Sequence, residues 1–134
     1  MTHSPTPYAS SSGELSVAAA ECLFHIAERS SWLEQRELTH YVPAEFEREG
    51  FIHLSTGEQV RATAVRYYQG STDICLLVLA RSALEAHLKW ENLLGGAEIF
   101  PHLYARLTVS AVVDVLAIRW EDSVVRFVAD ASGW

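Results

Sequence analysis

Residues 73–80 (DICLLVLA) form an almost unbroken apolar run of strand length. Such a run predicts a central β-strand that is buried on both of its faces. The chain has 134 residues, of which 49% are hydrophobic and 20% charged. These values are typical of a globular protein with one core, and they exclude a wholly disordered or fibrous chain. We therefore expect a single domain with one active surface.

Helices are expected mainly in the first half of the chain. Ser30 and Ser31, followed by Glu34, have the Ser-x-x-Glu form of a capping box, and Thr56 with Gln59 offers another. The expected helices run from about residue 30 to 38, 43 to 50 and 56 to 69, with one turn near 82–88. The expected strands cover 22–26, 51–54, 73–80, 89–91, 99–107 with an interruption at Pro101, 111–120 and 124–128. Because strands and helices stop alternating after residue 88, the pattern predicts an α+β fold.

The ends, cysteines and charge give four further expectations. Residues 1–15 are rich in Ser, Thr and Pro and are expected to be a flexible tail before a domain at 16–134. This start lacks the basic residues of a secretory signal, so we expect a cytoplasmic protein. Cys22 and Cys75 lie 53 positions apart in apolar stretches, which favours buried free thiols over a disulfide. A net charge of −7 disfavours a general surface for nucleic acid or for an anionic membrane, so neither is expected as a partner.

Common nucleotide and hydrolase motifs are absent from the sequence, including GxGxxG, GKS/T, HExxH and GxSxG. Polar residues inside apolar runs are the remaining candidates, because buried polar groups need partners or else face a cleft. They are His25, His53, Glu91, His102 and Tyr104. For His25 the alternative is an ordinary outward-facing strand residue.

His53 has the most specific context of these candidates. It lies at the end of an expected strand, and Ser55 and Thr56 follow at a helix start. An imidazole, two hydroxyls and free backbone N–H groups together suit a phosphate or a ribose hydroxyl. The alternative is that Ser55 and Thr56 only cap the helix.

Glu91 follows Trp90, which could exclude water and raise the pKa of a general base. The alternative is a surface carboxylate on a loop. His102, Tyr104 and Arg106 share one face of an expected strand, which is either solvated or the wall of a site. No histidine pair has metal-ligand spacing, so no metal is expected.

Several short segments, in this order and spacing, resemble the bacterial family called domain of unknown function 952. They are FIHLST at 51–56, EQV at 58–60, LKWE at 88–91, FPHLY at 100–104 and AVV at 111–113. The resemblance covers about residues 22–128. It implies an ADP-ribosyltransferase-like fold, in which a split and mostly antiparallel β-sheet wraps a cleft for a nicotinamide dinucleotide.

The resemblance also implies roles for particular residues. His25 would bind the ribose or amide end of NAD, and His53, Ser55 and Thr56 would line the nicotinamide pocket. Glu91 or His102 would orient the ribose hydroxyl or the nucleophile, with Glu91, His53 and His102 as the catalytic candidates. The ligand-binding candidates are His25, Ser55, Thr56, Trp90, Tyr104 and Tyr41.

The implied function is an ADP-ribosyltransferase-like enzyme that binds NAD or an ADP-ribosyl compound and acts at the nicotinamide ribose. NAD would be its substrate. The alternative is a small-molecule-binding protein, or a metabolite-tailoring acid–base enzyme, that reuses the same cleft without NAD chemistry. Lack of a basic stripe for a diphosphate favours this alternative, whereas the cluster of His53, Ser55 and Thr56 favours a ligand that carries phosphate.

Overall fold

The computed structural model describes residues 6–93 and 95–130. In these residues the strands are β1 (Cys22–Glu28), β2 (His40–Tyr41), β3 (Ile52–His53), β4 (Ile74–Ala80), β5 (Leu88–Glu91), β6 (Phe100–Leu103), β7 (Leu107–Thr108), β8 (Val112–Glu121) and β9 (Val124–Ala129). The α-helices are α1 (Arg29–Gln35), α2 (Phe46–Glu49) and α3 (Val60–Tyr68). Short 3-10 helices are η1 (Val17–Glu21), η2 (Arg81–Ala83), η3 (Glu85–His87) and η4 (Val109–Ala111).

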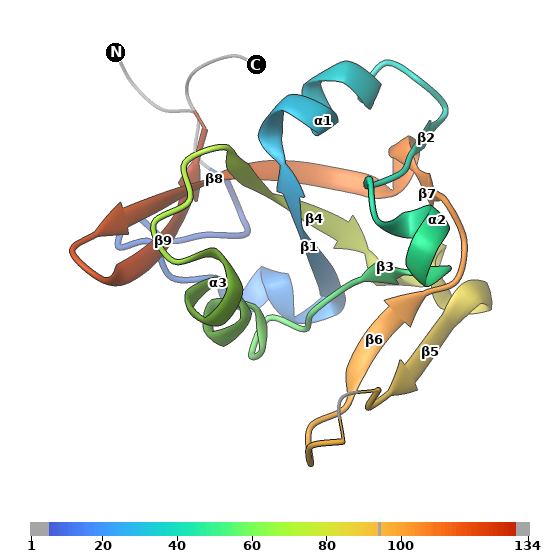
Figure 1. The fold of residues 1–134 in the computed structure, drawn as a ribbon. Coiled ribbons are helices and arrows are strands. Elements are labelled where there is room, and N and C mark those ends of the chain that lie inside the picture. The colour runs from blue at the N-terminus through green and yellow to red at the C-terminus, as the bar shows by residue number, and fades with distance from the viewer. Residues whose placement is uncertain (1–5, 94, 131–134) are drawn as a thin grey trace.

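The strands form a main sheet in the order β1-β4-β8-β9, a smaller sheet in the order β3-β6-β5, and the pair β2-β7. All pairings within these three sheets are antiparallel. Figure 1 shows the small sheet beside one end of the main sheet, with α3 near β9 and α1 near β4. The prediction of an α+β domain with mostly antiparallel strands is confirmed.

Strand β4 is the central strand of the core, as its apolar run predicts. It pairs with β1 on one side and β8 on the other, and its residues from Ile74 to Leu79 are buried. Cys75, Leu77 and Leu79 pack into the core on one face of the sheet. Leu76 and Val78 pack into a second core on the opposite face. A continuous apolar run is needed because neither face of β4 meets water.

Two of the predicted helix ends agree with the structure and two do not. Gly50 ends α2 with a φ of 80°, and Thr56 and Gln59 form the predicted capping box before α3. The capping box predicted at α1 is wrong, because the helix already begins at Arg29 and both Ser30 and Ser31 lie inside its first turn. Helix α1 also ends at Gln35, before residue 38, since the chain turns there toward β2.

Pro101 lies within β6 and does not interrupt it, which corrects the expectation from sequence. Its ring has no N–H to donate, so it should not sit deep inside a ladder. Pairing of β3 with β6 covers only Ile52 and His53, and the Pro101 carbonyl accepts a hydrogen bond from Leu54 just beyond it. The N–H that Pro101 lacks is therefore missing at the end of the β3–β6 ladder and not in its middle.

Residues 6–15 lie against the domain. Phe127 donates its N–H to the carbonyl of Gly13 at 3.0 Å, and the Arg126 side chain bonds to the carbonyl of Ser12. Tyr8 packs against one of the two cores. Flexibility of residues 1–15 stays a prediction, and residues 1–5 are outside the described part of the chain.

Cys22 and Cys75 are buried free thiols, as predicted. Burial raises the pKa of Cys75 to about 12, so its thiol stays protonated at neutral pH. In the part of the chain that the structure describes, no helix is long and apolar enough to cross a bilayer.

Candidate functional site

The edge of β1 is where the main and small sheets separate. Phe24 and Ser55 exchange two backbone hydrogen bonds of 2.8 Å, which join the segment after β3 to this edge. In an antiparallel ladder, alternate residues direct their backbone groups to the same side, so Ile26 faces the same edge as Phe24. No described residue pairs with the N–H and C=O of Ile26 there. The edge of β1 therefore offers one free peptide donor and one free acceptor.

His25 is buried beside this free edge, so the simple outward-facing alternative is wrong. Its Nδ1 lies 2.8 Å from the carbonyl oxygen of His53, and its Nε2 lies 3.4 Å from the hydroxyl of Tyr41. Because a carbonyl only accepts, Nδ1 carries the proton and Nε2 accepts from Tyr41. Burial lowers the pKa of His25, which keeps the imidazole neutral at pH 7.

A pocket of about 170 Å³ opens at this edge. His25, Tyr41 and Tyr68 give it aromatic walls, and Glu28 and Glu45 give it carboxylates. Burial raises the pKa of both tyrosines, and the charges of Glu28 and Glu45 raise them further. The pocket therefore combines neutral hydrogen-bonding groups with a negative field. Its full lining is His25, Ile26, Glu28, Ser31, Tyr41, Pro43, Ala44, Glu45, Tyr68 and Ile74.

Glu91, His102 and Tyr104 meet in a second group on the small sheet. The Tyr104 hydroxyl donates to Oε1 of Glu91, and Nδ1 of His102 lies 3.1 Å from the same oxygen. These bonds lower the pKa of Glu91 and, in return, raise that of Tyr104. The prediction that His102 and Tyr104 share a face agrees with this geometry, whereas Arg106 is exposed and takes no part in the hydrogen bonds that join the described residues of this group.

His53 lies between the two groups. Its carbonyl oxygen bonds to His25, while its exposed ring contacts the ring of His102 with centroids 5.3 Å apart. The ring Nε2 pairs with Glu49 of α2 at 3.0 Å. Phe51 covers the second group by stacking on His102 with centroids 4.4 Å apart. His53 thus connects the two polar groups through its backbone and its ring.

Ser55 and Thr56 are used structurally. Thr56 caps α3, and the Ser55 hydroxyl is 3.5 Å from that of Thr63. Neither residue lines the pocket at β1. Their hydroxyls are therefore committed to the start of α3, as the capping alternative expects.

Trp90 does not cover Glu91. Adjacent strand residues point to opposite faces, and Trp90 instead packs under the guanidinium of Arg81 at 4.9 Å. The predicted residues therefore divide into His25 with Tyr41 at the pocket, and His53, Glu91, His102 and Tyr104 on the small sheet.

Four polar residues of the pocket were not predicted from the sequence as site residues, namely Glu28, Ser31, Glu45 and Tyr68. Tyr68 falls on the apolar face of its helix and reads as core packing, and Glu45 follows Pro43 in a short polar helix. In the sequence, only the position of His25 in an apolar strand indicated a site at the edge of β1. Among the described residues no group of three or more side chains could hold a metal ion.

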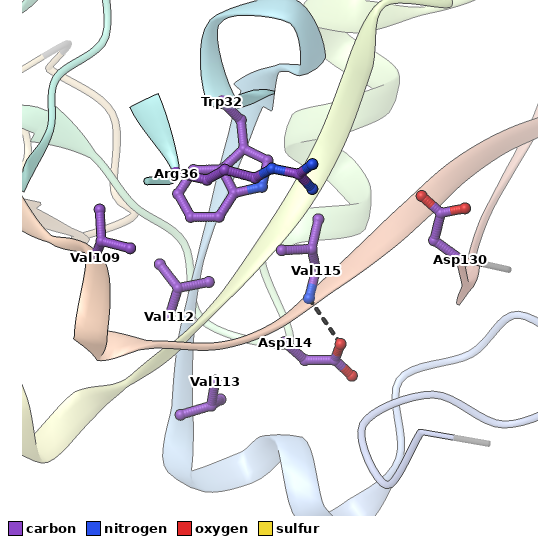
Figure 2. Close-up of a pocket in the computed structure, with 8 residues that line it drawn as sticks. All are labelled: Trp32, Arg36, Val109, Val112, Val113, Asp114, Val115 and Asp130. Atoms are coloured by element: carbon purple, nitrogen blue, oxygen red, sulfur yellow. Dashed lines mark hydrogen bonds between the residues drawn. The ribbon is translucent and has the colours of Figure 1, made fainter. Parts of the chain in front are cut away.

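A larger and more open hollow of about 390 Å³ lies elsewhere, beside α1 and β8 (Figure 2). Trp32 and Arg36 border it from α1, and valines of η4 and β8 form its floor. None of the predicted site residues lines it. We therefore place the candidate site at the edge of β1.

The sequence profile of a family described as protein of unknown function (DUF952) matches residues 26–115. The chain belongs to this family. It is similar to protein CC0527 from Caulobacter crescentus, whose crystal structure has 33% sequence identity and a TM-score of 0.70, covering 78% of this chain and 92% of that one. The solution NMR structure of CC0527 gives 34% identity and a TM-score of 0.68, covering 79% and 91%. No curated protein matches the sequence.

Proposed function

We propose that the protein is an ADP-ribosyltransferase-like enzyme that binds the nicotinamide end of NAD, or of an ADP-ribosyl compound, at the edge of β1. It would act at the nicotinamide ribose. The free peptide edge of Ile26, next to the buried His25, is the observation that carries this proposal. The separation of the sheets at Phe24 and Ser55 supports the split-sheet architecture that the family resemblance implies.

The free edge is complementary to a primary carboxamide. A carboxamide has an NH₂ donor and a carbonyl acceptor, which match the C=O and N–H of Ile26. Tyr41 and Tyr68 lie on the walls of the same pocket, where aromatic rings can pack against a pyridine ring. The volume of about 170 Å³ is smaller than the ~300–1,000 Å³ of pockets that enclose drug-sized ligands. It suits one end of a dinucleotide, with the rest outside.

The charges of the pocket suit the proposed chemistry. The nicotinamide ring of NAD is cationic, and loss of nicotinamide leaves positive charge on the ribose. Glu28 and Glu45 line the pocket, and a nearby carboxylate stabilises such a centre more in the transition state than in the ground state. In this proposal Glu45 or Glu28 is the carboxylate near the ribose, the role expected for Glu91. Glu91 itself is hydrogen-bonded to His102 and Tyr104 on the small sheet.

Calorimetric titration with nicotinamide, NAD and ADP-ribose tests the proposal. We expect micromolar binding of NAD. Nicotinate should bind at least tenfold more weakly than nicotinamide, because its carboxylate faces Glu28 and Glu45 and lacks the NH₂ donor. Ala44→Trp fills the pocket from an exposed position and should abolish binding. The matched control is Ala18→Trp in η1, which should bind normally.

The alternative function, a metabolite-binding or acid–base protein without NAD chemistry, has one observation in its favour. None of the described residues that line the pocket is Lys or Arg, so no cation there would hold a diphosphate. If neither nicotinamide nor NAD binds to the wild-type protein, the transferase proposal fails and this alternative replaces it.

A further inference from the structure

The second polar group lies on one face of the small sheet. His102 of β6 is the register partner of His53 in β3 and of Lys89 in β5. Residues directly opposite one another on paired strands project from the same face. His53, His102 and Lys89 therefore form a row across this sheet, with His102 at its centre.

Glu91 fixes which ring nitrogen of His102 carries a proton. Two hydrogen bonds to one oxygen lower the pKa of Glu91, so the group is a carboxylate and can only accept. Nδ1 of His102, 3.1 Å away, must then be the donor. The lone pair of the neutral imidazole is left on Nε2.

Nε2 of His102 reaches solvent although the side chain as a whole is only 6% exposed. It has no hydrogen-bond partner among the described residues. Among the described residues, every side-chain nitrogen or oxygen that is fully buried has a hydrogen-bond partner. Because Nε2 of His102 has no such partner, this atom is not fully buried. Phe51 holds the ring in place by stacking at 4.4 Å and 25°.

We propose that Glu91 and His102 form a general-base pair that hydrolyses a small activated ester, on a site separate from the pocket at β1. Nε2 of His102 takes a proton from water while the water oxygen bonds to the acyl carbon. The resulting imidazolium returns that proton to the leaving oxygen as the ester bond breaks. His102 is the catalytic residue, and Glu91 is a positioning residue that fixes its tautomer.

Lys89 supplies the second requirement for acyl chemistry. Its side chain is exposed in the same row as His102, and its ammonium lies 4.6 Å from the ring centroid of Tyr104. A cation beside the base can stabilise the oxyanion that forms as water attacks the carbonyl. This proposal uses none of the residues that line the pocket at β1, so it goes beyond the proposed NAD chemistry.

Hydrolysis of p-nitrophenyl acetate by the full chain tests the proposal. His102→Gln should lower kcat/KM at least tenfold, because general-base groups contribute about 10²–10⁴-fold. His87→Gln is the matched control, since His87 is an exposed histidine outside the row. Glu91→Gln should lower kcat and leave KM within about twofold of the wild type, because an amide can present its NH₂ group to Nδ1 and no longer fixes the tautomer of His102. A purely structural role for Glu91 would lower the amount of folded protein and leave kcat per folded molecule unmoved.

Three results would overturn the proposal. The first is a His102→Gln rate within twofold of the wild type, and the second is a wild-type rate no higher than that of free imidazole. The third comes from labelling the wild-type protein with diethyl pyrocarbonate, which needs no variant to fold. We expect His102 to be acylated faster than the more exposed His87, and the reverse order would contradict an activated Nε2. Unchanged nicotinamide binding by His102→Gln would show that the two sites are independent.

Discussion

Nδ1 of His25 donates to the carbonyl oxygen of His53 at 2.8 Å, and this bond joins the main sheet to the small sheet. One residue of β1 thereby fixes the position of β3 at the point where the two sheets separate. The same imidazole accepts from Tyr41 through its other nitrogen. The pocket at the edge of β1 depends on this neutral histidine, which is hydrogen-bonded at both of its ring nitrogens.

Tyr41→Phe should destabilise the protein by about 1 kcal/mol, because it removes the hydroxyl that donates to a buried ring nitrogen. Chemical denaturation measures this change. Tyr68→Phe is the control, since no hydrogen bond involves the hydroxyl of Tyr68 in the described structure. Equal losses in the two variants would contradict the role given to Tyr41.

Acid should destabilise the fold through His25. Its pKa is lowered below the ordinary 6.5 in the folded state, chiefly by burial, so the unfolded chain binds more protons below that pH. The free energy of unfolding should therefore be highest above pH 6.5 and fall as the pH drops, by at most about 1.4 kcal/mol per pH unit for this group. His25→Gln should flatten the curve between pH 6.5 and 5. An unchanged slope would show that His25 is protonated in the folded protein.

Glu91 should contribute to stability at neutral pH and lose that contribution in acid. Hydrogen bonds from Tyr104 and His102 lower its pKa below the ordinary 4.5, so the folded state favours the carboxylate. The thermal midpoint of the wild type should exceed that of Glu91→Gln at pH 7. The difference should shrink as the pH falls below about 4.5, and a difference that is constant down to pH 3 would contradict the assignment.

Several features of the fold could be predicted from local sequence. The apolar run of β4, the hairpin of β8 and β9, and the capping box of Thr56 and Gln59 each depend on neighbouring residues. His102 and Tyr104 could be assigned to one face because strand residues alternate. Glu91 joins them because β5 pairs with β6. This pairing could be predicted because the two strands are close together in the sequence.

The pocket at β1 could not be predicted in the same way. Glu45 and Tyr68 reach it from separate helices, and their own surroundings in the sequence indicate a surface helix and a core face. The free edge of Ile26 arises from where β3 leaves β1, which is a property of strand order. Sequence reasoning found His25 only because a histidine interrupts an apolar strand.

Gly13→Ala should destabilise the protein by more than Gly70→Ala. Both glycines have a positive φ, of 87° and 75°, so each alanine is strained by about 1 kcal/mol. An added Cβ at Gly13 would also lie 2.6 Å from Cβ of Arg126, whereas at Gly70 nothing lies within 4 Å. Equal thermal midpoints for the two variants would contradict the packing of residues 6–15 on β9.

The backbone amide of Ile26 gives the most direct test of the proposed ligand site. In a ¹H–¹⁵N spectrum titrated with nicotinamide, we expect the Ile26 amide to move more than that of Leu23, which faces β4, and nicotinate to leave it in place. A large Ile26 shift that saturates with nicotinamide would support recognition of the carboxamide by the free edge of β1. An Ile26 amide that does not move, while nicotinamide or NAD binds elsewhere or not at all, would contradict the account.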